Sequence, residues 1–158
     1  MMVAKKGVMK ILVVNGPNLN LLGEREPEVY GHDTLHDVNQ WIAQHTVSEA
    51  HELHFFQSNH EGQIIDYLHA HRKSASGVVI NPGGLTHYSI ALRDAIAGCQ
   101  VPTVEVHISD IHAREKFRQV SMVKDVCIAQ ISGHGKQGYV EAIELLVSYL
   151  QQSNGSVD

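Results

Sequence analysis

Residues 10–31 read KILVVNGPNLNLLGEREPEVYG. The apolar run Lys10–Val14 is typical of a buried β-strand. The residues after it are too rich in glycine, proline, asparagine and charge to form a helix or a strand. A long loop that leaves the carboxyl end of a first strand is where open α/β sheets build binding sites. This stretch therefore predicts both the start of the fold and one wall of a site.

The loop also carries reactive side chains. Arg25 and Tyr30 lie five residues apart around Pro27, so a bend in the chain can bring the guanidinium and the phenol together. A cation beside a phenol favours the phenolate, which is a base or a nucleophile. An ordinary surface loop with scattered polar residues remains the alternative interpretation of this segment alone.

Strand-like and helix-like stretches alternate along the rest of the chain. Strands are predicted at Lys10–Asn15, Glu52–Gln57, Gly77–Asn81, Thr103–His107 and Val126–Ser132. Helices are predicted at Thr34–His45, Gly62–Arg72, His87–Ala97, Ala113–Val120 and Tyr139–Leu150. This alternation favours an α/β fold, a doubly wound sheet of five parallel strands flanked by helices. Residues 1–158 are expected to form one domain with its core at about 9–150, a flexible N-terminal extension and a disordered tail from Gln151 to Asp158.

Composition excludes several classes of protein. The 158 residues carry a formal net charge of −5, so no broad basic surface for nucleic acid is expected. No apolar run approaches the roughly 20 residues that span a bilayer, and the N-terminus lacks the pattern of a secretory leader. Cys99 and Cys127 are interpreted as reduced core residues. We expect a cytoplasmic protein.

A second group of reactive residues lies in the fourth predicted strand. Glu105 and His107 are two residues apart, so they share one face near the strand's carboxyl end. A carboxylate beside an imidazole orients it and suits it to act as a general acid. A purely structural Glu–His pair is the alternative.

Two further segments are candidates for binding an anion. Residues 81–87 read NPGGLTH, where two glycines allow close approach of a ligand to the backbone. An ordinary turn with Thr86 as the N-cap of the next helix is the alternative. Arg114 and Arg118 have the spacing of one helix face and suit a carboxylate or phosphate, although a solvated face is the usual explanation of such a pattern.

The segment Gly133–Gly138 matches the G-x-G-x-x-G pattern of dinucleotide sites. It belongs to the last βα unit, and no strand follows to supply the acidic residue that such sites need. We therefore predict that these glycines allow tight packing of the final helix. The twelve histidines show no set with convincing ligand spacing, so no metal site is predicted.

Taken together, NGPNLNLLGEREPEVYG, NPGGLTH, VEVHISDIHAREKFR and the late G-x-G-x-x-G-Y closely resemble the type II 3-dehydroquinate dehydratases. The resemblance covers roughly Met9–Leu150, with the motifs in the family's order and spacing. It implies a flavodoxin-like fold, and loss of water from 3-dehydroquinate to give 3-dehydroshikimate without a metal or cofactor. It also implies a homododecamer built from trimers.

The resemblance assigns roles to individual residues. Tyr30 would be the base, Arg25 would activate it, and Asn18 would help to stabilise an enolate through a water. His107 would protonate the departing hydroxyl while Glu105 orients it. The positions that match the family's substrate-binding residues are Asn81, His87, Ile108, Ser109 and Arg118. Arg114 matches a lid-side arginine, and Asp94 matches a residue that enters a neighbouring subunit's site.

Two rival functions belong to other classes. One is a nucleotide-binding flavodoxin-like module that uses Gly133–Gly138, and the other is a structural protein that keeps the fold without activity. The sequence also leaves open whether the reaction serves the shikimate pathway of aromatic biosynthesis or the breakdown of quinate. No lysine shows the buried strand-end pattern of a Schiff base, which favours enolate chemistry.

Overall fold

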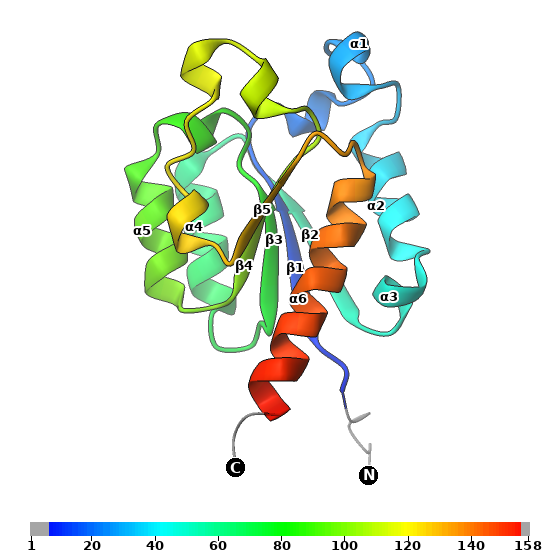
Figure 1. Ribbon diagram of the computed structural model, residues 1–158, viewed down its shortest axis with the longest axis vertical. Coiled ribbons are helices and arrows are strands. Elements are labelled where there is room, and N and C mark those ends of the chain that lie inside the picture. Colours follow the sequence, from blue (N-terminus) through cyan, green and yellow to red (C-terminus); the bar gives the residue numbers. More distant parts are fainter. Residues whose placement is uncertain (1–6, 156–158) are drawn as a thin grey trace.

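The computed structural model describes residues 7–155 and contains a single sheet of five parallel strands (Figure 1). The strands are β1 (Lys10–Asn15), β2 (Glu52–Gln57), β3 (Gly77–Asn81), β4 (Thr103–His107) and β5 (Ala129–Ser132). Their order in the sheet is β2-β1-β3-β4-β5. The chain reverses direction across the sheet after β2, which creates a switch point between β1 and β3. The predicted flavodoxin-like α/β fold is confirmed.

Six α-helices lie among the described residues: α1 (Pro27–Tyr30), α2 (Leu35–Ala43), α3 (Thr46–Glu49), α4 (Glu61–His71), α5 (Ile90–Cys99) and α6 (Gln137–Gly155). Figure 1 shows α4 and α5 on one face of the sheet and α2, α3 and α6 on the other. The short helix α1 lies apart from both layers, above the carboxyl edge of the sheet. Within residues 7–155, no helix combines the length and apolar character needed to cross a membrane.

Alternation along β1 divides the core in two. Ile11 and Val13 are fully buried in the cluster that also contains Ile143 of α6. Leu12 and Val14 point to the opposite face, into the cluster with Ile64 of α4 and with Leu92 and Ile96 of α5. Because both faces of a parallel sheet are covered by helices, such a strand is apolar throughout. This burial explains the uninterrupted apolar run in the sequence.

The helices on the two faces begin at side-chain caps. The hydroxyl of Thr34 accepts a hydrogen bond from the Asp37 amide, and the Asp37 carboxylate accepts one from the Thr34 amide, which forms a capping box. Ser89 caps α5 by accepting from the Leu92 amide at 2.9 Å. The predicted start of this helix at His87 is therefore wrong, and so is the alternative in which Thr86 caps it: Gly83–His87 forms a separate 3-10 turn.

Two predicted elements differ from the structure after β4. A helix over Ala113–Val120 does not form, and two 3-10 turns at Ile111–Ala113 and Lys116–Arg118 take its place. Phe117 and Val120 are both exposed, so this segment packs no large apolar side chain against the domain that would stabilise a helix here. β5 begins at Ala129 rather than Val126, because its pairing with β4 starts where Ala129 meets Val104.

The first loop and the C-terminus also differ from expectation. The loop after β1, predicted to be irregular, contains a 3-10 turn at Leu19–Leu21 and the single-turn helix α1. Helix α6 continues to Gly155, so the prediction of a disordered tail is wrong for residues 151–155. No proline or glycine interrupts that segment before Gly155. Residues 1–6 of the predicted N-terminal extension, which runs to about residue 8, and residues 156–158 of the predicted tail lie outside the described residues.

The loops that follow β1 and β3 come into contact at the switch point between these two strands. The Gly16 amide donates to the Asn81 carbonyl at 2.8 Å. A Cβ atom at Gly16 would lie 2.3 Å from the carbonyl oxygen of Pro82, so only glycine fits there. This contact joins the loop after β1 to the loop after β3 and sets one side of the site.

Candidate active site

A cavity of about 190 Å³ lies at the carboxyl edge of the sheet, between the loops that follow β1, β3 and β4. Ten of the predicted site residues line it: Asn18, Arg25, Tyr30, Asn81, His87, His107, Ile108, Ser109, Arg114 and Arg118. Glu105 lies behind His107 and does not line the cavity. Asp94 is exposed on α5 and also lies outside the cavity. The structure therefore brings together residues from four separate segments of the chain.

Tyr30 is the last residue of α1, and its phenol lies beside two guanidinium groups. Arg114 Nη1 donates to Tyr30 Oη at 2.6 Å. The Cζ atom of Arg114 lies 5.5 Å from the centroid of the Tyr30 ring, and that of Arg25 lies 5.7 Å from it. Arg25 is close to the phenol as the loop sequence suggests, but the hydrogen bond comes from Arg114, which is 84 residues away.

A carboxylate shares the two arginines with Tyr30. Glu26 Oε2 lies 3.7 Å from Arg25 Nη2 and 3.7 Å from Arg114 Nη2. The backbone of Glu26 has a φ of 44°, in the left-handed region that non-glycine residues rarely adopt. This conformation starts α1 and directs its side chain toward the arginines. The segment thus holds both cations next to the phenol.

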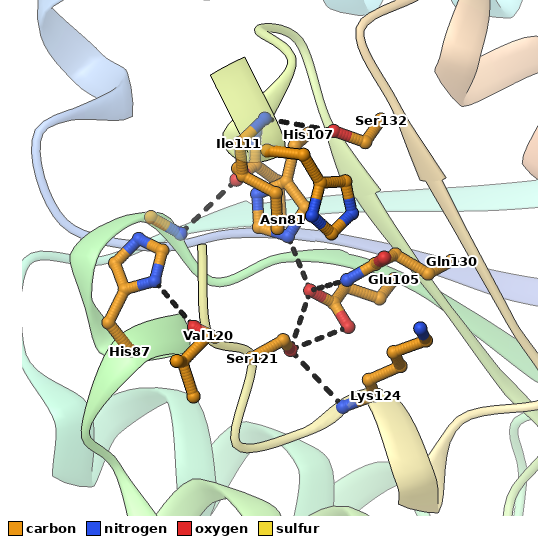
Figure 2. A network of polar contacts seen from close by, with 12 residues as sticks. Asn81, His87, Glu105, His107, Ile111, Val120, Ser121, Lys124, Gln130 and Ser132 are labelled. Atoms are coloured by element: carbon orange, nitrogen blue, oxygen red, sulfur yellow. Dashed lines mark hydrogen bonds and ion pairs between the residues drawn. The ribbon is translucent and has the colours of Figure 1, made fainter. Parts of the chain in front are cut away.

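Figure 2 shows the polar network around Glu105 and His107. Glu105 is fully buried, and its Oε2 atom accepts a hydrogen bond from His107 Nε2. Ser121 Oγ lies 2.9 Å from both carboxylate oxygens of Glu105, and Gln130 Nε2 donates to Oε2 at 3.1 Å. Burial alone would raise the pKa of Glu105, but the bond to His107 and its charge, together with Gln130 and Ser121, hold it below its ordinary value.

Sequence reasoning missed Ser121 and Gln130. Gln130 interrupts an apolar strand, and the same signal drew attention to Glu105. Parallel pairing places Gln130 directly beside Glu105 and Ser132 beside His107. Ser121 gives no comparable signal, because its partner becomes apparent only when the loop after the 3-10 turn Lys116–Arg118 folds back on β4.

His87 faces the cavity from the loop after β3. Its Nδ1 atom donates to the carbonyl of Val120 at 2.7 Å, which leaves Nε2 as an acceptor. Burial lowers the pKa of His87; the charges of His107 and Arg118 lower it further, against the opposing effects of the Val120 bond and Glu105. His87 is therefore a neutral imidazole at pH 7.

The buried side chain of Tyr139 fixes the position of Asn81 through a hydrogen bond. Tyr139 Oη donates to Asn15 Oδ1 at 2.6 Å and accepts from Asn81 Nδ2 at 3.0 Å. Asn81 Oδ1 accepts from the Gly83 amide at 3.1 Å. Burial raises the pKa of Tyr139, so its hydroxyl remains protonated. With Oδ1 engaged, Asn81 keeps its second N–H as a donor.

The remaining cavity residues come from two loops. Asn18 has a φ of 70°, and its amide donates to Asn59 Oδ1 at 2.9 Å, which ties the first loop to the end of β2. Ile108 and Ser109 directly follow β4. Arg118 pairs with Glu115, with Nε 2.7 Å from the carboxylate. Arg114 and Arg118 both reach the cavity, although they do not share a helix.

The segment Gly133–Gly138 packs against the sheet. A Cβ atom at Gly138 would lie 3.4 Å from side-chain atoms of both Ile131 and Val106, which is contact distance for the start of α6. The amides of Gly133 and Gly135 donate to the carbonyls of His107 and Ile108. This arrangement matches the packing role expected of these glycines. Among the described residues, no group of three or more histidine, cysteine or acidic side chains could hold a metal ion.

Comparison with known proteins relates this arrangement to one family. The family model described as dehydroquinase class II matches residues 9–147. A 3-dehydroquinate dehydratase from Halothermothrix orenii is 52% identical over 145 residues, which cover 92% of this chain and 98% of that protein. One from Bacillus licheniformis is 51% identical over 91% of this chain and 97% of that protein.

Solved structures indicate the same family. The type II dehydroquinase of Butyrivibrio crossotus has a TM-score of 0.85 and 46% identity, and the match covers 88% of this chain and 97% of that one. The type II dehydroquinase of Propionibacterium acnes has a TM-score of 0.84 and 37% identity over 89% of this chain and 97% of that one. Fold, motif order and overall similarity lead to one conclusion: the chain belongs to the class II dehydroquinase family.

Proposed function

We propose that this chain is a 3-dehydroquinate dehydratase that eliminates water from 3-dehydroquinate, by a trans route through an enolate, to give 3-dehydroshikimate. One observation carries the proposal: a phenol held by a guanidinium and an imidazole held by a carboxylate line the same cavity. A dehydration beside a ketone needs one base for the carbon-bound proton and one acid for the departing hydroxyl. Tyr30 and His107 are suited to these two roles.

Tyr30 removes the proton from the carbon beside the ketone. The C–H electron pair moves toward the carbonyl oxygen, so an enolate forms while the phenolate becomes a phenol. The guanidinium of Arg114, 2.6 Å from Tyr30 Oη, stabilises the phenolate before this step, and Arg25 adds a second positive charge nearby. Asn18 lines the same cavity and helps to stabilise the enolate oxygen through a water.

His107 completes the elimination. Its Nε2 atom donates to Glu105, so Nδ1 is the nitrogen that delivers a proton to the departing hydroxyl. The C–O bond breaks, the enolate electrons form the new double bond, the ketone is restored and water leaves. The proton taken up by Tyr30 must then return to His107 for the next cycle. No step requires a metal or a cofactor.

Polar and cationic groups around the cavity suit the substrate's carboxylate and hydroxyls. We assign substrate binding to Asn81, His87, Ile108, Ser109, Arg114 and Arg118. Asn81 supplies an N–H donor and His87 a neutral acceptor, so the two can recognise different hydroxyl groups. An arginine fork matches a carboxylate, and Arg118 lines the same cavity as His87.

We also propose assembly into a homododecamer of trimers, in which Asp94 reaches a neighbouring subunit's site. Asp94 is exposed on α5 and does not line the cavity of its own chain, which supports a role in trans. Exposed apolar side chains near the start of α5 suit an interface between copies: Tyr88, Ile90, Phe117 and Val120. A role in the shikimate pathway and a cytoplasmic location stay predictions.

The test is formation of the conjugated enone. Chelator-treated protein is mixed with 3-dehydroquinate, and the absorbance of 3-dehydroshikimate is followed. We expect turnover at the same rate with and without the chelator, and no change in NAD(P)H or FMN signal on titration. A chain that forms no enone, or one that binds a nucleotide through Gly133–Gly138, would contradict the proposal.

A further inference from the structure

The buried carboxylate of Glu105 is surrounded by hydrogen-bond donors. His107 and Gln130 reach Oε2, and the Ser121 hydroxyl lies 2.9 Å from each oxygen (Figure 2). A fully buried carboxylate needs such donors, because it has lost its water. Only one of these three donors, His107, belongs to the acid–base pair itself. The other two need a separate explanation.

The direction of the Ser121 hydroxyl is set by its other neighbour. The Lys124 amide donates to Ser121 Oγ at 3.2 Å. An N–H group occupies one lone pair of the oxygen, so the hydroxyl proton is left to point at Glu105. Ser121 follows Val120, whose carbonyl accepts the bond from His87 Nδ1. The same short segment therefore contacts His87 directly and His107 through Glu105.

Gln130 comes from the edge strand β5. The register pairs Glu105 with Gln130, so their side chains lie on one face of the sheet, next to each other. Its Nε2 atom donates to Glu105 at 3.1 Å. Gln130 lies between the apolar residues Ala129 and Ile131. Among the described contacts, Glu105 is the only hydrogen-bond partner of its side chain.

We propose that Ser121 and Gln130 are positioning residues that keep Glu105 ionised and directed at His107, so that His107 presents Nδ1 to the substrate. The inference rests on the proposed dehydratase function and deepens it. With Ser121, Gln130 and His107 all donating, the carboxylate is an acceptor only. His107 must then carry its proton on Nε2 when neutral, and its second proton, the reactive one, on Nδ1.

Other titratable groups near Glu105 keep one charge state through the neutral range. Burial and the charge of Glu105 raise the pKa of the Cys127 thiol to about 12, so it stays protonated. Burial holds the pKa of His87 below its ordinary value, so it stays neutral. Lys124 and Arg118 also lie in the loop between β4 and β5. The base Tyr30 also contributes to the acidic limb of a pH profile, but it is the same in every variant. A shift of that limb between variants therefore reports the Glu105–His107 pair as a unit.

The experiment compares the pH dependence of kcat for the wild type, Ser121→Ala and Gln130→Leu. Each substitution removes one donor from a charged acceptor. We expect kcat to fall roughly tenfold and the acidic limb to move up by about one pH unit, because Glu105 becomes protonated more easily. KM should change by less than about twofold. Ser121→Thr keeps the hydroxyl and should restore the wild-type profile.

Thr103→Val is the matched control. It removes a hydroxyl from the same strand as Glu105, but this hydroxyl donates to the Val101 carbonyl instead. The control should lower thermal stability without moving the acidic limb. If Ser121→Ala and Gln130→Leu also kept the wild-type limb and kcat, the positioning roles would be refuted.

A second measurement does not depend on turnover. In a ¹⁵N-labelled sample, His107 should show a protonated Nε2 in slow exchange, a signal that disappears in His107→Ala. We expect this signal to weaken or broaden in Gln130→Leu and Ser121→Ala. An unchanged signal in both variants would overturn the inference. If the wild type formed no enone, the proposed function would fail, and this spectrum would still decide the positioning roles.

Discussion

Replacing Tyr139 by Phe tests the buried hydrogen bonds that support the cavity residue Asn81. Tyr139 is fully buried on α6, and its hydroxyl connects Asn15 of β1 with Asn81 of β3. Phenylalanine keeps the ring and its packing against the sheet. The substitution therefore removes two hydrogen bonds and little else.

The magnitude follows from the groups left without a partner. Asn15 Oδ1 and Asn81 Nδ2 would each lose a bond in a buried position. Stranding a buried polar group costs about 1–3 kcal/mol. Asn81 borders the cavity, where water can replace its partner, so its share lies at the low end. We expect the free energy of unfolding to fall by about 2–4 kcal/mol, a large part of the 5–15 kcal/mol typical of a domain.

The assay is urea denaturation at fixed protein concentration, with steady-state kinetics on the same samples. Tyr149→Phe on the same helix is the control, because Tyr149 is 42% exposed and its loss should change stability by less than about 0.5 kcal/mol. Asn81 also loses its anchor, so KM should rise more than kcat falls. Equal stability of the two variants would refute the account of this network.

Four further predictions follow from the site. Tyr30→Phe should lower kcat by at least ~10² with little change in KM, and near-normal turnover would mean that another group is the base. The pKa of Glu105 is lowered in the folded chain, so its carboxylate stabilises the fold at pH values above the ordinary pKa of 4.5. This contribution to the free energy of unfolding is lost as the pH falls. Glu105→Gln should therefore lose less unfolding free energy than the wild type on acidification, and parallel curves would contradict this. Borohydride with substrate should not inactivate the enzyme, whereas a stable lysine adduct would indicate a Schiff base. Ultracentrifugation should find a particle near twelve times 17.5 kDa, and Asp94→Ala should lower kcat/KM; a fully active monomer would contradict both.

Much of the fold was predictable because its signals are local. β1, β2, β3 and β4 have the predicted bounds, since each is a short apolar run between polar turns. The start of β5 was not predictable in this way. Val126 is as apolar as Ile131, and only the pairing with β4 decides that the strand begins at Ala129.

For the site too, features set by local sequence were predictable, and features set by distant segments were not. Glu105 and His107 share a face because of strand geometry, which spacing reveals. The donor to Tyr30 could not be found by spacing, because Arg25 is near in sequence while Arg114 makes the bond across 84 residues. Ser121 and Tyr139 are polar groups whose partners lie on other elements, so only the folded chain identifies them.

The segment that carries Tyr30 also borders the cavity, so its position affects both the entry of a substrate and the placement of the phenol. Gly23 and Gly31, with φ values of 88° and 82°, bound the segment that ends in Tyr30, and both have the backbone freedom of hinges. If this segment swings outward to admit a substrate, the phenol leaves the cavity with it and its bond to Arg114 is broken. On the proposed mechanism, a molecule opened in this way has no base in place. Removal of the substrate's proton would then require this segment to close over the substrate first.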